Sequence, residues 1–185
     1  MKIVETKLTD ILLLETEIYR DTRGYFQEIF RDYNCPFLGN HRQFVQENHS
    51  RSKKDVLRGL HFQQPNPQGK LVHVLAGAIQ DVVVDVRQGS PNFGKWVSFD
   101  LTAGDGKSLW IPEGYAHGIL SLEENTDLIY KVTDYWSPES EHTIRWDDPE
   151  LNIEWQAKVP ILNEKDLQAL NLQEATNLPK YADTK

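Results

Sequence analysis

Apolar residues in this chain occur in short runs that are separated by Gly, Pro, Asn and Asp, and helical periodicity is scarce. Runs of this length and punctuation are typical of β-strands. The pattern predicts strands over Ile11–Tyr19, Tyr25–Phe30, Phe44–Asn48, Val56–Phe62, Leu71–Ala76, Ile79–Arg87, Trp96–Leu101, Ser108–Ile111, Gly118–Leu122, Asp127–Thr133 and Thr143–Trp146. Because many short strands recur at fairly even spacing, we expect an all-β sandwich or barrel of the jelly-roll type.

The clearest alternation runs from Ile79 to Arg87. One face carries three valines and a glutamine, and the other carries Asp81, Asp85 and Arg87 beside two apolar residues. Successive residues of a strand point to opposite faces. The charged face therefore lies outside or lines a polar cavity.

The C-terminal part favours a short helical segment. Asn163 can act as the N-cap, Asp166 follows three residues later, and leucines stand at 167, 170 and 172. Asp166 in this position can be an ordinary capping acid. We expect one domain over residues 1–185, with a polar tail that frays from about residue 177.

The charge balance limits the partners. The chain has 20 basic and 28 acidic residues, a formal charge of −8, which disfavours nucleic acid and anionic membranes. The charged N-terminal segment has no long apolar run, which argues against a signal peptide or a membrane span. The one cysteine, Cys35, fits a reducing, cytoplasmic location.

Polar residues inside strand-like segments are the candidates for chemistry. Gln46, Asn48 and Ser50 share one face of a strand. Arg23, Arg58 and Lys70 would make a basic cluster in an acidic protein. Such a cluster favours an anion, because the arginine fork donates two parallel hydrogen bonds to phosphate.

Nine ordered blocks along nearly the whole chain resemble the dTDP-4-dehydrorhamnose 3,5-epimerase family. They are Asp21-x-Arg23-Gly24-x-Phe26-x-Glu28, Gln46-x-Asn48-x-Ser50, Leu57-Arg58-Gly59-Leu60-His61-Phe62-Gln63, Gln68-Gly69-Lys70-Leu71-Val72, Asp81-Val82-x-Val84-Asp85-x-Arg87, Ser90-Pro91-x-Phe93-Gly94, Trp110-Ile111-Pro112-Glu113-Gly114-x-Ala116-His117-Gly118, Tyr130-Lys131-x-Thr133 and Glu164-Lys165-Asp166. The resemblance implies a cupin-like jelly-roll barrel, a homodimer with N-terminal strands in its interface, and no metal or dissociable cofactor. It implies epimerisation of a dTDP-4-keto-6-deoxy-hexose at carbons 3 and 5.

The resemblance also implies roles for particular residues. His61 would be the base, Asp166 its partner, Tyr130 the acid on the opposite ring face, and Lys70 the group that stabilises the enolate. This set suits the chemistry, because epimerisation next to a ketone needs a base, an oxyanion partner and an opposed acid. The implied substrate contacts are Arg23, Glu28, Gln46, Asn48, Arg58, Asp81, His117, Tyr135, Glu141 and Lys165.

Three other functions are compatible with parts of the pattern. The chain could be a 5-only or 3-only epimerase of a related nucleotide keto-sugar, or a sugar-binding module without catalysis. A metal-dependent cupin could use His61, His73 and His117, but Gln63 stands where the second histidine of a His-x-His pair would be.

Arg58 and His61 must point to the same face of their strand if both belong to the implied site. Residues three apart point to opposite faces of a regular strand, yet the implied site needs both side chains. A β-bulge at Gly59 or Leu60 would resolve this, with Leu60 turned into the packed layer.

Overall fold

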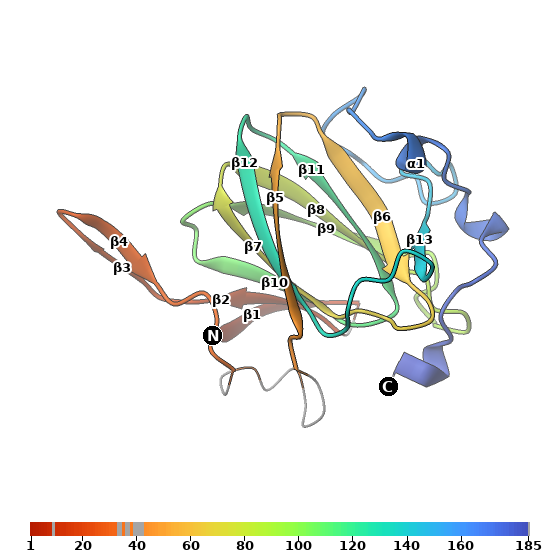
Figure 1. Cartoon of the computed structure of the whole chain (residues 1–185), viewed down its shortest axis with the longest axis horizontal. Helices are drawn as coiled ribbons and strands as arrows, with labels where there is room; N and C mark the ends of the chain where they lie inside the picture. The colour runs from red at the N-terminus through yellow and green to blue at the C-terminus, as the bar shows by residue number, and fades with distance from the viewer. Residues whose placement is uncertain (9, 33–34, 36–37, 39–42, 185) are drawn as a thin grey trace.

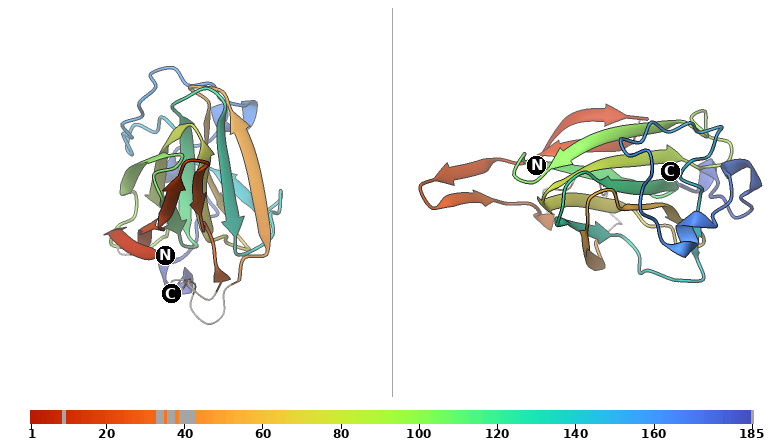
Figure 2. Two further views of the ribbon diagram at one scale, coloured as in Figure 1. Left: turned by 90° about the vertical axis from the view of Figure 1, so that its left-hand side faces the viewer. Right: turned by 90° about the horizontal axis from the view of Figure 1, so that it is seen from above.

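The fold consists of two antiparallel sheets that face each other. The computed structural model describes residues 1–8, 10–32, 35, 38 and 43–184. The larger sheet has the order β1 (Lys2–Lys7), β2 (Ile11–Glu15), β10 (Lys107–Ile111), β7 (Lys70–Ala76), β12 (Thr126–Val132), β5 (Gln46–Ser52). The smaller sheet has the order β13 (Glu141–Thr143), β6 (Leu57–Gln63), β11 (Tyr115–Ser121), β8 (Ala78–Asp85), β9 (Trp96–Thr102). The expected all-β, cupin-like jelly roll is confirmed (Figures 1 and 2).

A separate two-stranded hairpin projects from this body. It is formed by β3 (Ile18–Asp21) and β4 (Gly24–Gln27), which pair antiparallel. The hairpin extends beyond the two sheets, at the left in Figure 1. The sequence pattern predicted one long strand over Ile11–Tyr19, whereas the chain breaks after Glu15 and resumes at Ile18.

The core between the sheets explains the alternation in β8. Ile79 and Val83 pack in one cluster with residues of the other sheet, including Val72 and Leu109. Val82, on the opposite face, packs against the C-terminal part of the chain. All of β8 is buried. The acidic side chains of β8 therefore point into the interior between the sheets, which excludes the outward placement that the sequence left open.

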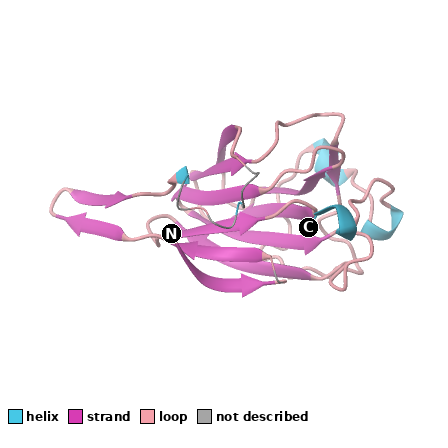
Figure 3. Ribbon diagram, turned by 90° about the horizontal axis from the view of Figure 1, so that it is seen from below, coloured by secondary structure: helices cyan, strands magenta, loops and turns pink. Residues whose placement is uncertain are grey.

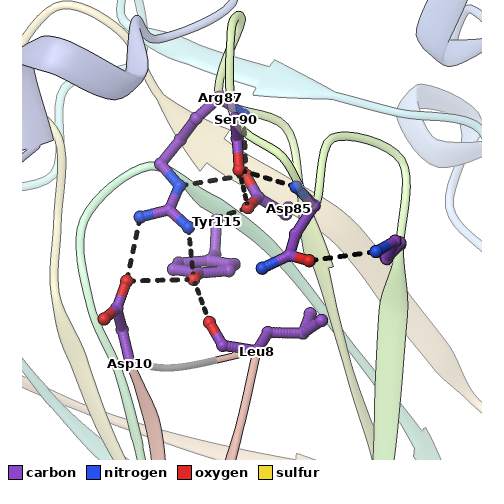
Figure 4. Close-up of polar contacts among 8 residues, drawn as sticks. Leu8, Asp10, Asp85, Arg87, Ser90 and Tyr115 are labelled. Carbon is purple, nitrogen blue, oxygen red and sulfur yellow. Dashed lines mark hydrogen bonds and ion pairs between the residues drawn. The ribbon is translucent and has the colours of Figure 1, made fainter.

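A buried polar network fastens the turn between β1 and β2 to the body (Figure 4). Arg87 donates to both oxygens of Asp85, from Nε at 2.9 Å and from Nη2 at 2.7 Å. Nη1 donates to Asp10 at 3.1 Å, and Nη2 also donates to the Tyr115 hydroxyl. Tyr115 in turn donates to the carbonyl oxygen of Leu8, at 3.2 Å. Arg87 and Asp85 are almost fully buried, so the paired hydrogen bonds are what make burial of both charges tolerable.

The helices are short, and strands dominate the structure (Figure 3). Helix α1 spans Glu164–Leu167, and its N-cap is Asn163, whose side chain accepts from the Asp166 amide at 2.7 Å. The predicted cap is thus confirmed, although the helix ends before Leu170. Within the described part of the chain, no helix is long and apolar enough to span a membrane.

The C-terminal tail packs against the body over several residues. We expected fraying from about residue 177, but Leu178 is buried. The Gln88 amide donates to the Pro179 carbonyl at 2.8 Å, and the Tyr181 amide donates to the Gln88 carbonyl at 3.1 Å. These backbone bonds hold the tail as far as Tyr181.

Strand β6 contains the predicted irregularity. His61 pairs with His117 of β11, whereas Arg58 pairs with Ile119, so two residues of β6 stand opposite Gly118. This is a β-bulge. Leu60 is fully buried among apolar residues. Arg58 and His61 both line the same cavity, as expected.

We expect Gly59→Ala to destabilise the protein more than Gly89→Ala. Both glycines have positive φ, +131° and +84°, so alanine adds backbone strain of about 1–3 kcal/mol at either position. At Gly59 a Cβ would also lie 2.5 Å from the Gly118 Cα, whereas nothing lies within 4 Å at Gly89. This clash should cost roughly 1–3 kcal/mol more. Urea unfolding of both variants measures the difference, and equal losses would show that β6 yields easily at the bulge.

Candidate active site

A cavity of about 410 Å³ lies between the two sheets. Many of the polar residues singled out in the sequence meet there, from both sheets. The lining residues are Gln46, Asn48, Ser50, Arg58, His61, Gln68, Lys70, His117, Ile119, Leu128, Tyr130, Trp136, Glu141 and Asn163.

His61 is held by a buried carboxylate. Its Nε2 lies 2.6 Å from Oδ1 of Asp166, which is fully buried, and Oδ2 of Asp166 accepts from the Gly59 amide at 3.2 Å. Asp166 therefore serves in the first turn of α1 and as the partner of His61. Because an ionised carboxylate only accepts, the facing nitrogen carries the proton in neutral His61, and the other ring nitrogen keeps a lone pair.

A second histidine beside it has a similar partner. His117 Nε2 lies 2.9 Å from both oxygens of Asp81, which is fully buried on β8. His117 is the β11 residue paired with His61, so the two imidazoles come from neighbouring strands of one sheet. Asp81 does not line the cavity but fixes a residue that does.

Lys70 brings a buried ammonium group to the cavity. Its Nζ donates to the His61 carbonyl at 3.3 Å. Burial lowers the pKa of Lys70 to about 8, although the negative charges of Glu141 and Asp81 act in the opposite direction. Lys70 is therefore a cation that can lose its proton close to neutral pH.

Tyr130 approaches the same cavity from the other sheet, on β12. Burial raises the pKa of its phenol, and the charge of Glu141 adds to this, while the charge of Arg58 and a hydrogen bond from Asn48 act to lower it. Tyr130 is thus a protonated phenol at neutral pH. His61 and Tyr130 belong to different sheets, so an imidazole and a phenol line the cavity from the two layers of the fold.

The remaining charged groups form pairs around the cavity. Glu141 is paired with Lys165. Burial acts to raise the pKa of Glu141, but the Lys165 hydrogen bond and the charge of His61 outweigh it and lower the pKa. Lys165 lies behind Glu141 and outside the lining. The Arg58 guanidinium is oriented by Ser52 Oγ at 3.1 Å.

Besides Asp81 and Lys165, three more of the predicted substrate contacts lie outside the cavity lining. Arg23 pairs with Asp21 in the projecting hairpin, and Glu28, just beyond it, pairs with Arg31. Tyr135 is 64% exposed, and its neighbour Trp136 lines the cavity instead.

Several lining residues were not selected from the sequence. Ser50 could have been, because it shares a strand face with Gln46 and Asn48. Trp136, Gln68 and Asn163 stand in loops, where alternation gives no signal.

His61, His73 and His117 do not form a metal cluster. His73 lies apart from the cavity lining, with Nδ1 3.0 Å from both Ser108 Oγ and the Lys107 carbonyl. Among the residues that the structure describes, no three His, Cys, Asp or Glu side chains are grouped to hold a metal ion.

Comparison with known proteins gives consistent matches. A family model described as dTDP-4-dehydrorhamnose 3,5-epimerase matches residues 5–174. The dTDP-4-dehydrorhamnose 3,5-epimerase of Salmonella typhimurium is 46% identical over 95% of this chain and 97% of its own length. That of Neisseria gonorrhoeae is 49% identical over 90% of this chain, which spans only 51% of that relative.

A solved structure extends the match to three dimensions. The dTDP-6-deoxy-D-glucose-3,5-epimerase of Legionella pneumophila, crystallised with dTDP-4-keto-L-rhamnose, is 44% identical. It superposes with a TM-score of 0.93 over 97% of this chain and 98% of that chain. The chain belongs to the dTDP-4-dehydrorhamnose 3,5-epimerase family.

Proposed function

We propose that this protein epimerises a dTDP-4-keto-6-deoxy-hexose at carbons 3 and 5, giving dTDP-4-dehydro-L-rhamnose for dTDP-L-rhamnose synthesis. Membership of the epimerase family supports this reaction. The observation that carries the proposal is that His61 and Tyr130 line one cavity from opposite sheets. Inversion of a carbon requires a proton to leave one face and another to arrive on the opposite face.

The first half of the reaction removes a proton. His61, with its other nitrogen held by Asp166, takes the proton from the carbon next to the ketone. The C–H electron pair moves into the ring, and negative charge develops on the ketone oxygen. The Lys70 ammonium group is the cation that would stabilise this enolate.

The second half returns a proton to the other face. Tyr130 donates its phenolic proton to the same carbon and becomes a phenolate, which the charge of Arg58 and the hydrogen bond from Asn48 favour. Exchange with solvent resets His61 and Tyr130. The same pair of steps at the carbon on the other side of the ketone completes the double inversion.

The other lining residues would hold the substrate. Arg58 is suited to the diphosphate, because it is oriented by Ser52 and partly exposed at the cavity. Gln46, Asn48 and His117 offer polar groups along the sugar, and Glu141 with Lys165 would close one side.

We also propose that the protein acts as a homodimer in the cytoplasm. Tyr19, Tyr25 and Phe26 of the projecting hairpin are 56%, 52% and 68% exposed, which is unfavourable for an isolated subunit. A partner that covers the hairpin would bury them. It would also bring Arg23 and Glu28 to the partner's cavity, in line with the role that family resemblance implies for them.

His61→Asn is expected to lower turnover by about 10²–10⁴-fold, because asparagine cannot accept the proton. Proton NMR with dTDP-4-keto-6-deoxy-glucose in deuterated buffer would follow exchange and inversion at each carbon. His49→Asn is the matched control, because His49 pairs with Asp127 away from the cavity lining. Undiminished exchange at both carbons in His61→Asn would remove His61 from the mechanism. Inversion at one carbon alone in the wild type would make the protein a mono-epimerase.

The pH dependence of kcat/KM should reveal the loss of the proton from Lys70. Because the ammonium form stabilises the enolate, kcat/KM should fall as the pH rises through about 8, where Lys70 loses its proton. The raised pKa of Tyr130 places the loss of the phenolic proton at higher pH. Lys70→Arg keeps its charge in this range and should move the alkaline limb upward. An alkaline limb at the same pH in Lys70→Arg would assign it to another group.

Mixing two inactive variants tests the dimer. If Arg23 contributes to the partner's site, Arg23→Ala and His61→Asn should each have low epimerase activity when assayed alone. A one-to-one mixture should regain about a quarter of wild-type activity, because half of the dimers are mixed and each has one intact site. Sedimentation should show a dimer throughout. A fully active monomer, or a mixture with no regained activity, would contradict this arrangement.

A further inference from the structure

A line of hydrogen bonds connects the loop after β12 to Tyr130. The backbone amide of Trp136 donates to Oε1 of Gln46 at 3.1 Å. Nε2 of Gln46 donates to Oδ1 of Asn48 at 2.8 Å. Asn48 then faces Tyr130 across the paired strands and acts to lower the pKa of its phenol, which is the effect of a hydrogen bond donated to the phenol oxygen. Strand register supports this sequence of contacts, because Asn48 lies directly opposite Tyr130 on the paired strands β5 and β12.

The donor and acceptor of every hydrogen bond in this line follow from the bond donated by the Trp136 amide. A backbone N–H can only donate, so the Gln46 atom that faces Trp136 must be the oxygen. The other end of the Gln46 amide is therefore the NH₂ group, and the Asn48 atom that receives it must be oxygen. The remaining end of Asn48 is its own NH₂ group, which can only donate to Tyr130.

This polarity has a consequence for the phenol. A tyrosine hydroxyl has one proton and can also accept. Since Asn48 donates to the Tyr130 oxygen, the proton of Tyr130 is not used on that side. It remains available to an acceptor in the cavity, which Tyr130 lines.

We infer that Gln46 is a positioning residue that orients Asn48 as a donor and thereby keeps the Tyr130 proton directed at the substrate. The inference rests on the proposed epimerase function and deepens it. Gln46 acts through Asn48 and not by contact with the reacting carbon. The same arrangement stabilises the phenolate that remains after proton transfer, in agreement with the lowering effect of the Asn48 hydrogen bond on the pKa of Tyr130.

Gln46→Glu reverses the donor and acceptor roles along this line of hydrogen bonds, with almost no change in the shape of the side chain. One carboxylate oxygen can still accept from the Trp136 amide, but the other can no longer donate to Asn48. The Asn48 amide then turns to donate to Glu at position 46 and presents its oxygen to Tyr130. Tyr130 donates its proton to that oxygen, and the enolate is left to recover a proton from the His61 side.

The readout is how the enolate partitions in deuterated buffer. Return from the His61 side gives deuterium with retained configuration, whereas transfer from Tyr130 gives inversion. We expect Gln46→Glu to raise the ratio of exchange with retention to inversion by about tenfold or more, the effect of losing one well-placed hydrogen bond. The same change in Tyr130→Phe should be as large or larger. The double variant should show no higher ratio than Tyr130→Phe, because Gln46 acts only through Tyr130.

Gln63→Glu is the matched control. Gln63 holds the same loop, by accepting from the Ser137 amide at 2.9 Å and donating to the Tyr135 carbonyl at 3.2 Å, but it lies outside the cavity lining. Its substitution disturbs the loop without reaching Tyr130, so the ratio should stay at the wild-type value even where kcat falls.

Two results would overturn the inference. An unchanged ratio in Gln46→Glu, with a raised KM, would make Gln46 a plain substrate contact. An equal rise in Gln63→Glu would make the effect one of loop anchoring. Should Gln46→Glu fail to fold, Gln46→Met removes both hydrogen bonds without adding charge, and an unchanged ratio there is equally decisive. Exchange and inversion by the wild-type enzyme test the proposed function separately.

Discussion

The contact between Gly59 and Gly118 is the constraint on which the arrangement of the site depends. A Cβ on Gly59 would lie 2.5 Å from the Gly118 Cα, so the two strands can approach this closely only because Gly59 has no side chain. This approach permits two residues of β6 to stand opposite one residue of β11. The extra residue turns Arg58 and His61 to the same side, and it also places the Gly59 amide where the Asp166 carboxylate can accept from it. The roles proposed for Arg58 in anion binding, for His61 in proton abstraction and for Asp166 in orienting His61 thus depend on one backbone feature.

The two-layer architecture suits a reaction that works on both faces of a flat intermediate. The five-stranded sheet provides His61 with the buried Asp166 behind it, and the six-stranded sheet provides Tyr130 and Lys70. A side chain on a central strand has little freedom to move, because neighbouring strands fix the backbone on both sides. The proposed acid and base are therefore held on separate layers of the fold.

Sequence reasoning succeeded where burial imposes a pattern. The central strands, the bulge at Gly59, the cap at Asn163 and most of the cavity lining followed from alternation, glycine placement and family resemblance. Strand β1 was missed because most of Lys2–Lys7 is exposed, and an edge strand with polar residues on both faces shows no alternation. Trp136 was passed over for Tyr135, because only the fold of the loop decides which of two adjacent aromatic residues faces the cavity. The tail was expected to fray because its sequence is polar. Its contacts with Gln88 are backbone hydrogen bonds, which the side-chain pattern does not record.

The polar network around Arg87 has an effect beyond the burial of its own charges. The network hydrogen-bonds to Leu8 and Asp10, just before the start of β2. The C-terminal end of β2 leads into the projecting hairpin. Strand β2 is also hydrogen-bonded along most of its length to β10, so it is held both by the Arg87 network at its start and by the sheet. The orientation of the hairpin relative to the two sheets then depends on how the Arg87 network holds the start of β2. In a symmetric pair of subunits, a small tilt of β2 at Arg87 would be magnified at the tip of each hairpin, so the precision with which two subunits fit together is decided far from the surface where they would touch.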